Sequence, residues 1–157
     1  MEKELYKIEL KNTIDYEGKL NNHDDYLKIL NILERKSSFI GIVGEHKIIK
    51  RFRNDVIKVE KSLSWWTEET SIVEPIYYIK VSSELFDFLR KYETFCKTIV
   101  YKNKLFNYET LRAETTDFGV DDIAFFDSDD NILLATVTHE GFIYVADTVD
   151  KEFQINK

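Results

Sequence analysis

The sequence predicts an α+β fold, in which a C-terminal antiparallel β-meander carries about three helices on one side of the sheet. Two observations point to it: helix-like spacing of apolar residues recurs through the first hundred positions, and three β-rich runs joined by short turns fill the last third. No linker rich in proline, glycine or serine divides the chain, so residues 1–157 are expected to form one domain.

The N-terminal elements are predicted in the following order. Alternating apolar residues predict a strand over 5–10, and the polar stretch 11–21 is expected to be turn-like. A helix should begin after Asn22, because asparagine is a favoured N-cap and acidic residues follow in the first turn. Its apolar stripe consists of Tyr26, Ile29, Leu30 and Leu33. A short buried strand is expected over 38–43.

The next segment has the most regular pattern of the chain. Its apolar residues follow one another at spacings of three and four; they are Ile49, Phe52, Val56, Val59, Leu63 and Trp66. This spacing favours a long amphipathic helix over residues 49–66. The alternative is a hairpin, with 53–55 as the turn and 56–59 as a strand.

The middle of the chain is expected to contain a further strand and helix. Pro75 marks the entry to a strand over 76–81, and Ser82 or Ser83 should cap the helix that follows. Its buried side would consist of Leu85, Phe88, Leu89, Tyr92 and Cys96, which makes the single cysteine a core residue rather than a reactive thiol. A short strand is expected over 98–101, and 102–115 remains unassigned.

The last third is expected to form the β-meander. Its three strands are 122–126, 132–138 and 142–145. The turns between them are 127–131, which is rich in aspartate, and 139–141, which ends in glycine. Tight connections of this kind require antiparallel neighbours.

The charge is distributed unevenly along the chain. The net charge is −7, yet residues 107–157 contain twelve acidic and three basic side chains, and the first 106 residues are slightly basic. An acidic surface on a rigid meander speeds encounter with a basic protein. The expected partner-binding residues are Asp121, Asp122, Asp127, Asp129, Asp130, Glu140 and the aromatic Trp65.

Metal-binding and catalytic patterns are incomplete. Asp127, Asp129 and Asn131 have the spacing that opens a calcium loop, but Ile132 and Thr138 occupy the positions that need glycine and glutamate. No metal or cofactor is therefore expected. A small hydrolase using His139 with nearby carboxylates is one alternative function, since carboxylates beside an imidazole supply acid–base groups.

A second alternative is a regulatory module that binds nucleic acid. The segment 47–61 contains Lys47, Lys50, Arg51, Arg53, Lys58 and Lys61, and such a basic face can contact phosphates. The acidic balance of the whole chain argues against this alternative.

The leading hypothesis is a non-enzymatic protein-binding protein that acts on a basic partner. An inhibitor or immunity protein that covers the basic active site of a toxin or nuclease fits the acidic C-terminal third. A cytoplasmic location is expected, because the N-terminus lacks a signal-peptide pattern and no apolar run reaches the roughly 18 residues that a membrane helix needs.

Overall fold

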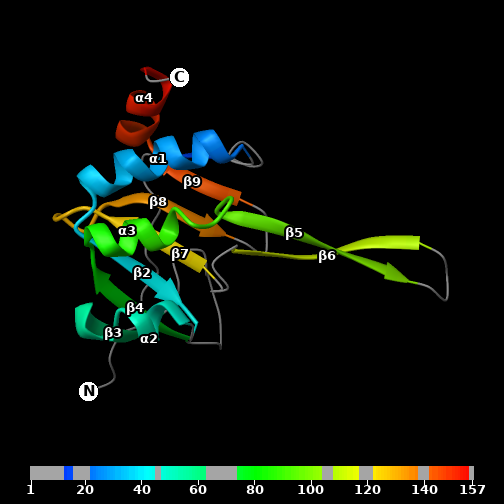
Figure 1. Ribbon diagram of the computed structural model, residues 1–157, viewed down its shortest axis with the longest axis horizontal. Coiled ribbons are helices and arrows are strands. Elements are labelled where there is room, and N and C mark those ends of the chain that lie inside the picture. The colour runs from blue at the N-terminus through cyan, green and yellow to red at the C-terminus, as the bar shows by residue number, and fades with distance from the viewer. Residues whose placement is uncertain are drawn as a thin grey trace.

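The computed structural model describes residues 13–15, 22–44, 47–62, 74–103, 108–116, 122–137 and 142–155. These residues form a seven-stranded antiparallel sheet with helices, and a separate two-stranded ribbon (Figure 1). The α+β prediction is confirmed. None of the described helices is long and apolar enough to cross a membrane.

The predicted meander forms one half of the large sheet. Its strands are β7 (Asp122–Phe126), β8 (Ile132–Val137) and β9 (Phe142–Ala146). The other half comes from earlier in the chain, because β2 (Phe39–Val43) pairs antiparallel with both β7 and β4 (Glu74–Lys80). The full strand order is β1-β9-β8-β7-β2-β4-β3, which leaves β3 (Val56–Ser62) at one end.

The strand at the other end corrects one expectation. β1 (Thr13–Asp15) pairs with β9, although 11–21 was expected to be turn-like throughout. Pairing with β9 stabilises a strand that its polar sequence does not predict, because strand formation depends strongly on the neighbouring strand. The strand predicted over 5–10 lies outside the described residues.

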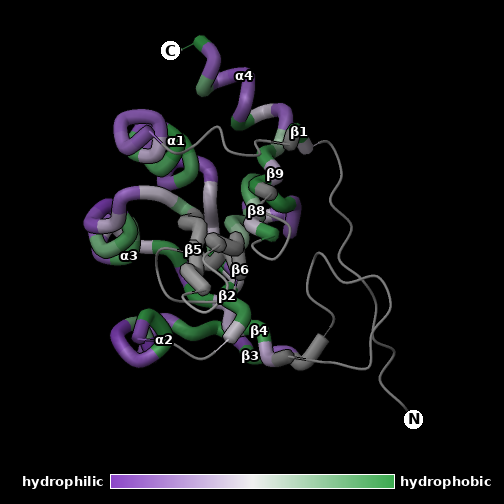
Figure 2. Tube along the Cα trace, turned by 90° about the vertical axis from the view of Figure 1, so that its right-hand side faces the viewer, coloured by the Kyte–Doolittle hydropathy of each residue, from purple (hydrophilic) through white to green (hydrophobic). Residues whose placement is uncertain are grey.

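Three helices lie on one side of the sheet, as predicted (Figure 2). They are α1 (His23–Lys36), α2 (Lys47–Arg51) and α3 (Ser83–Leu89). Asn22 and Ser82 are the N-caps of α1 and α3, and each side chain accepts a backbone hydrogen bond from the first turn. A fourth helix, α4 (Asp147–Ile155), was not anticipated and packs against α1.

The long helix predicted over 49–66 is wrong. The helix α2 ends at Arg51, a 3-10 turn η1 follows at Arg53–Asp55, and β3 begins at Val56. The hairpin alternative correctly placed a turn at 53–55 and a strand from residue 56. β-branched residues in β3 pair with β4, and this tertiary pairing overrides the helical spacing. The supposed stripe does not share one buried face, because Phe52 is buried and Val59 is exposed.

The two-stranded ribbon consists of β5 (Cys96–Asn103) and β6 (Tyr108–Thr116), and it extends away from the body of the molecule (Figure 1). It is longer than the short strand expected over 98–101, and it includes most of the unassigned stretch. The placement of Cys96 on the helical stripe is wrong, because α3 ends at Leu89 and Cys96 begins β5.

The core occupies both faces of the large sheet. On the helix side, Tyr26 and Leu30 of α1 pack with Ile42, Phe125 and other apolar side chains of the central strands. On the opposite side, Tyr78 and Phe126 belong to a second buried cluster. The central strands are therefore apolar on both faces, whereas the terminal strand β3 has exposed residues.

Candidate binding surface

The predicted acidic surface is only partly assembled. Asp122 is 2% exposed, and its Oδ1 accepts a hydrogen bond from Thr136 Oγ1 at 2.8 Å. Its carboxylate is therefore buried, and Asp122 is not one of the exposed residues that could contact a partner. Asp121, Glu140 and Trp65 lie outside the described residues, as does His139.

The β7–β8 turn presents two of the predicted carboxylates outward. Asp127 shapes the turn, since its Oδ1 accepts from the backbone N–H groups of Asp129 and Asn131, both at 2.9 Å. Asp130 adopts a positive φ of 64°. The side chains of Asp129 and Asp130 are exposed, and neither has an ion-pair partner within the described part of the chain. The described residues contain no group of three or more metal-ligating side chains.

Other C-terminal acids are paired with basic side chains. Glu152 of α4 bonds the Arg35 guanidinium and lies 3.4 Å from Lys36 Nζ, so the N-terminal half neutralises it. The hydrogen bond from Arg35, together with both positive charges, holds the pKa of Glu152 below its ordinary value of 4.5. Asp147 is paired with Lys151 at 3.0 Å. The acidic C-terminal third therefore does not form one continuous negative surface among the described residues.

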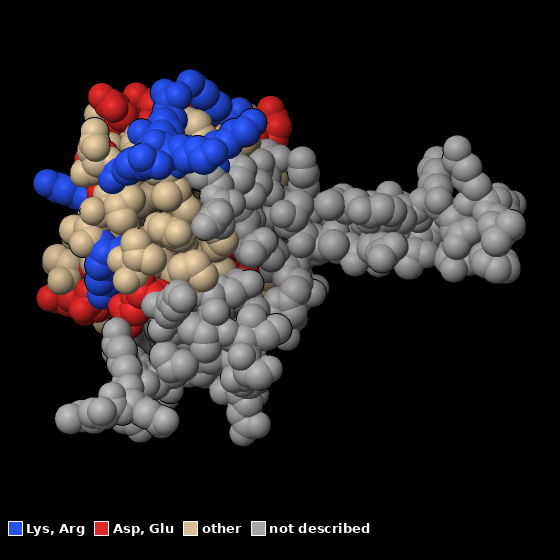
Figure 3. Space-filling view, turned by 90° about the horizontal axis from the view of Figure 1, so that it is seen from below, with Lys and Arg blue, Asp and Glu red and all other residues tan. Residues whose placement is uncertain are grey.

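Basic side chains gather on α2 and η1 (Figure 3). Lys47, Lys50, Arg51 and Arg53 are exposed, and none has an ion-pair partner among the residues that the structure describes. Ile48 is buried in the helix-side core, so the short helix turns its apolar side inward and its cations outward.

One of these cations rests on aromatic rings. The Arg51 guanidinium carbon lies 5.3 Å from the ring centroid of Phe88 and 5.9 Å from that of Phe52. Phe52 in turn meets Phe88 edge to face, and Phe88 meets Tyr92 edge to face at 5.6 Å. This cation–π contact limits the conformations of Arg51 while its charge stays accessible.

The strand that follows η1 adds apolar groups to this surface. Ile57 and Val59 of β3 are 59% and 53% exposed. Lys58 lies between them, with its Nζ 4.6 Å from the ring centroid of Tyr78 and 3.4 Å from Glu60 Oε2. We define the basic edge as the side chains of Lys47, Lys50, Arg51, Arg53, Ile57 and Val59.

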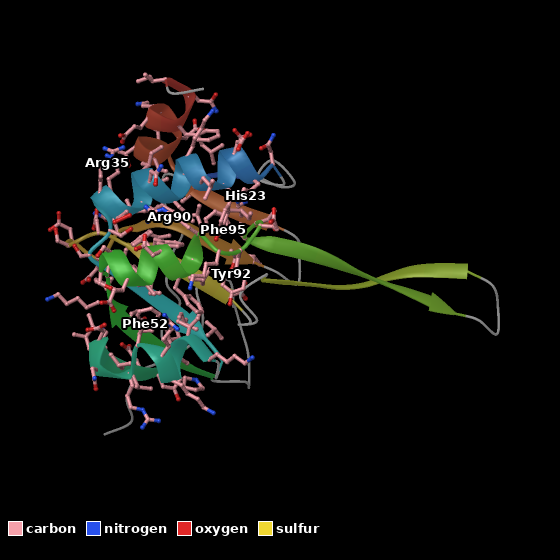
Figure 4. All side chains as sticks on the ribbon, in the orientation of Figure 1. His23, Arg35, Phe52, Arg90, Tyr92 and Phe95 are labelled. Atoms are coloured by element: carbon pink, nitrogen blue, oxygen red, sulfur yellow. The ribbon has the colours of Figure 1, made fainter. Side chains whose placement is uncertain are left out.

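Two further polar clusters have structural roles. Arg90 donates to Glu34, Asn31 and Asp87, and so links α1 to α3 (Figure 4). His23 Nδ1 lies 3.0 Å from the Glu93 carbonyl oxygen at the start of α1. The Arg90 cluster joins two helices, and the His23 contact joins α1 to the loop that follows α3.

Sequence reasoning identified the basic residues of this surface but missed its apolar part. Ile57 and Val59 were assigned to a helix, and only their pairing next to β4 reveals them as exposed residues of a terminal strand. The alternation of apolar Ile57 and Val59 with polar Lys58 and Glu60 was the available signal. The chain matches no protein-family model, no curated protein and no solved structure in the comparisons.

Proposed function

We propose that this chain is a non-enzymatic protein-binding protein whose basic edge docks on an acidic surface of its partner. Two observations carry the proposal. Four exposed cations on α2 and η1 have no ion pair in the described part of the chain, and the terminal strand that directly follows η1 has two exposed aliphatic side chains. Cations at a surface speed encounter with an acidic partner. Exposed aliphatic groups supply apolar area that association buries.

The apolar part of the basic edge favours a protein partner over nucleic acid. A nucleic-acid surface is contacted mainly through phosphate oxygens, for which Lys and Arg suffice. Ile57 and Val59 gain nothing from phosphate, whereas they match the apolar centre of a protein interface. The single cysteine allows no intrachain disulfide, which is consistent with an interaction in the reducing cytoplasm.

A second candidate function keeps the basic partner that the acidic C-terminal third predicts. Asp129 and Asp130 are exposed, and Asp127 holds their turn in place. We propose this turn as the contact if the protein is an inhibitor or immunity protein for a basic toxin or nuclease. The two candidates differ in the sign of the partner surface.

Capture of partners by charge variants separates these candidates. The test variant carries Lys47→Gln, Lys50→Gln and Arg53→Gln, and leaves Arg51 on its aromatic rings. The matched control carries Lys28→Gln, Lys91→Gln and Lys151→Gln, which remove the same charge from other exposed positions. Wild type, both variants and Asp129→Asn/Asp130→Asn are used as bait in lysate of the native cell.

The expected result is an acidic protein that wild type and the matched control retain and that the test variant loses. Its retention should fall as salt increases, because ions screen exposed charges beyond roughly 10 Å at 0.1 M. Equal retention by the test variant and its control would refute the role of the basic edge. Loss in the Asp129→Asn/Asp130→Asn variant alone would support the second candidate instead.

A further inference from the structure

We propose that the partner contributes an extended acidic segment, which adds to β3 as an eighth strand of the large sheet. This inference rests on the proposed function and specifies how the basic edge binds. Addition of a strand to a sheet edge supplies backbone hydrogen bonds for affinity, and the alternating side chains supply specificity.

The position of β3 in the sheet makes this addition feasible. β3 is the last strand in the order, and within the described residues it pairs with β4 alone. Ile57, Lys58 and Val59 are exposed in succession, so both faces of the strand are open to solvent at these three positions. No described strand lies along its outer backbone N–H and C=O groups, so another strand can pair with them there.

A β-bulge determines which part of β3 is usable. The pairing with β4 shifts between Val56 and Lys58, and Ile57 is the additional residue. From Lys58 to Ser62 the register with β4 is continuous. A bulge interrupts regular pairing, so we expect the added strand to align with 58–62 and its end to contact Ile57.

The two sides of an added strand would meet different groups. Val59 lies opposite Tyr77, on the side of the sheet that α2 occupies (Figure 2). Lys58 lies opposite Tyr78, on the other side, where Glu60 neutralises it. Every second residue of the added strand would thus face the cations of α2 and η1, which have no ion-pair partner among the described residues, and the intervening residues would face a neutral ion pair.

The chemistry of the segment follows from this difference. Glutamate residues at every second position lie on the side of Val59, so their aliphatic stems contact Val59 while their carboxylates extend toward Lys47, Lys50, Arg51 and Arg53. Apolar β-branched residues at the intervening positions favour the extended conformation. The expected ligand is a segment in which acidic and β-branched residues alternate.

The test uses two synthetic peptides of equal composition and charge. In one, Glu and Val alternate over a length that spans 58–62; in the other, the Glu residues and the Val residues form separate blocks. Binding to the full chain is measured by fluorescence anisotropy at low and at physiological salt. Amide hydrogen exchange of 56–62 is followed with and without peptide.

We expect the alternating peptide to bind on the order of tenfold more tightly than the block peptide, because only its carboxylates all face α2. It should also slow amide exchange in 58–62. The variant Ile57→Ser/Val59→Thr should weaken binding, and its unfolding midpoint should match wild type, since both positions are more than half exposed.

Strand addition would be overturned if both peptides bound with equal affinity. If the Lys47→Gln/Lys50→Gln/Arg53→Gln variant then lost binding of both, the basic edge would remain a binding surface. Unchanged amide exchange in 58–62 at saturating peptide would overturn strand addition as well. Absence of binding by either peptide would also overturn it, and the capture experiment would then judge the proposed function separately.

Discussion

Replacing Gly41 by alanine tests the packing on the sheet face opposite the helices. Gly41 lies in the middle of β2, between β4 and β7. A Cβ atom at this position would lie 3.1 Å from Phe126 Cε2, 3.4 Å from Tyr78 Cε1 and 3.5 Å from Ile76 Cγ2. Only the contact with Phe126 is closer than ordinary van der Waals distance, so the Phe126 ring decides the result.

The surroundings of Phe126 prevent an easy adjustment. Its ring stacks on Phe39 at 4.9 Å and meets Tyr78 at 5.8 Å, and the side chain is buried. Overpacking of this kind typically costs about 1–3 kcal/mol. Removal of glycine from a strand returns about 0.5–1 kcal/mol by restricting the unfolded chain. We therefore expect Gly41→Ala to lower the free energy of unfolding by about 1 kcal/mol, or the Tm by about 2–4 °C for a chain of this size.

A double-mutant cycle with Phe126→Leu identifies the cause. Leucine removes the ring edge that the new methyl group meets, so Gly41→Ala should be neutral or slightly stabilising in that background. Urea unfolding of the four proteins, followed by tryptophan fluorescence and circular dichroism, should give a coupling of about 1 kcal/mol. A stabilising Gly41→Ala in the wild-type background, or additive effects, would show that Phe126 does not lie over Gly41.

Three further predictions concern stability. Tyr26→Phe removes the buried hydroxyl that donates to the Leu89 carbonyl, which keeps the Tyr92 backbone N–H as a donor, and should cost about 0.5–1.5 kcal/mol in urea unfolding; an unchanged midpoint would contradict this bond between α1 and α3. Glu152→Gln should destabilise the protein at neutral pH. The pKa of Glu152 is lower in the folded state than its ordinary value of 4.5, so the ionised carboxylate stabilises the folded state at pH values above 4.5. That difference from wild type should disappear as the pH falls through the lowered pKa, whereas a difference that persists in acid would exclude the Arg35 ion pair as its source. Asp130→Gly should be more stable than Asp130→Ala by about 1 kcal/mol in thermal unfolding, since φ is positive there; equal stability would contradict that backbone conformation.

Local signals were sufficient for several elements. Asn22 and Ser82 cap helices because a short polar side chain accepts a hydrogen bond from an unpaired N–H group of the first turn. The β7–β8 turn follows from Asp127, whose carboxylate bonds the backbone within four residues. These features depend on neighbours in the chain, so the sequence alone predicts them.

Features that depend on distant partners were not predictable in this way. Val56 and Val59 fit a helical stripe as well as a strand, and only pairing with β4 selects the strand. The polar segment Thr13–Asp15 becomes a strand only because β9 lies beside it.

The candidate site divides in the same way. The caps, the meander, the basic segment and the acidic C-terminal third all follow from the order of residues along the chain. The three-dimensional fold shows which charges remain available, because ion pairs such as Arg35–Glu152 join residues that are far apart in the chain. It also placed Ile57 and Val59 on a terminal strand, since the exposure of a side chain depends on whether another strand or helix covers it.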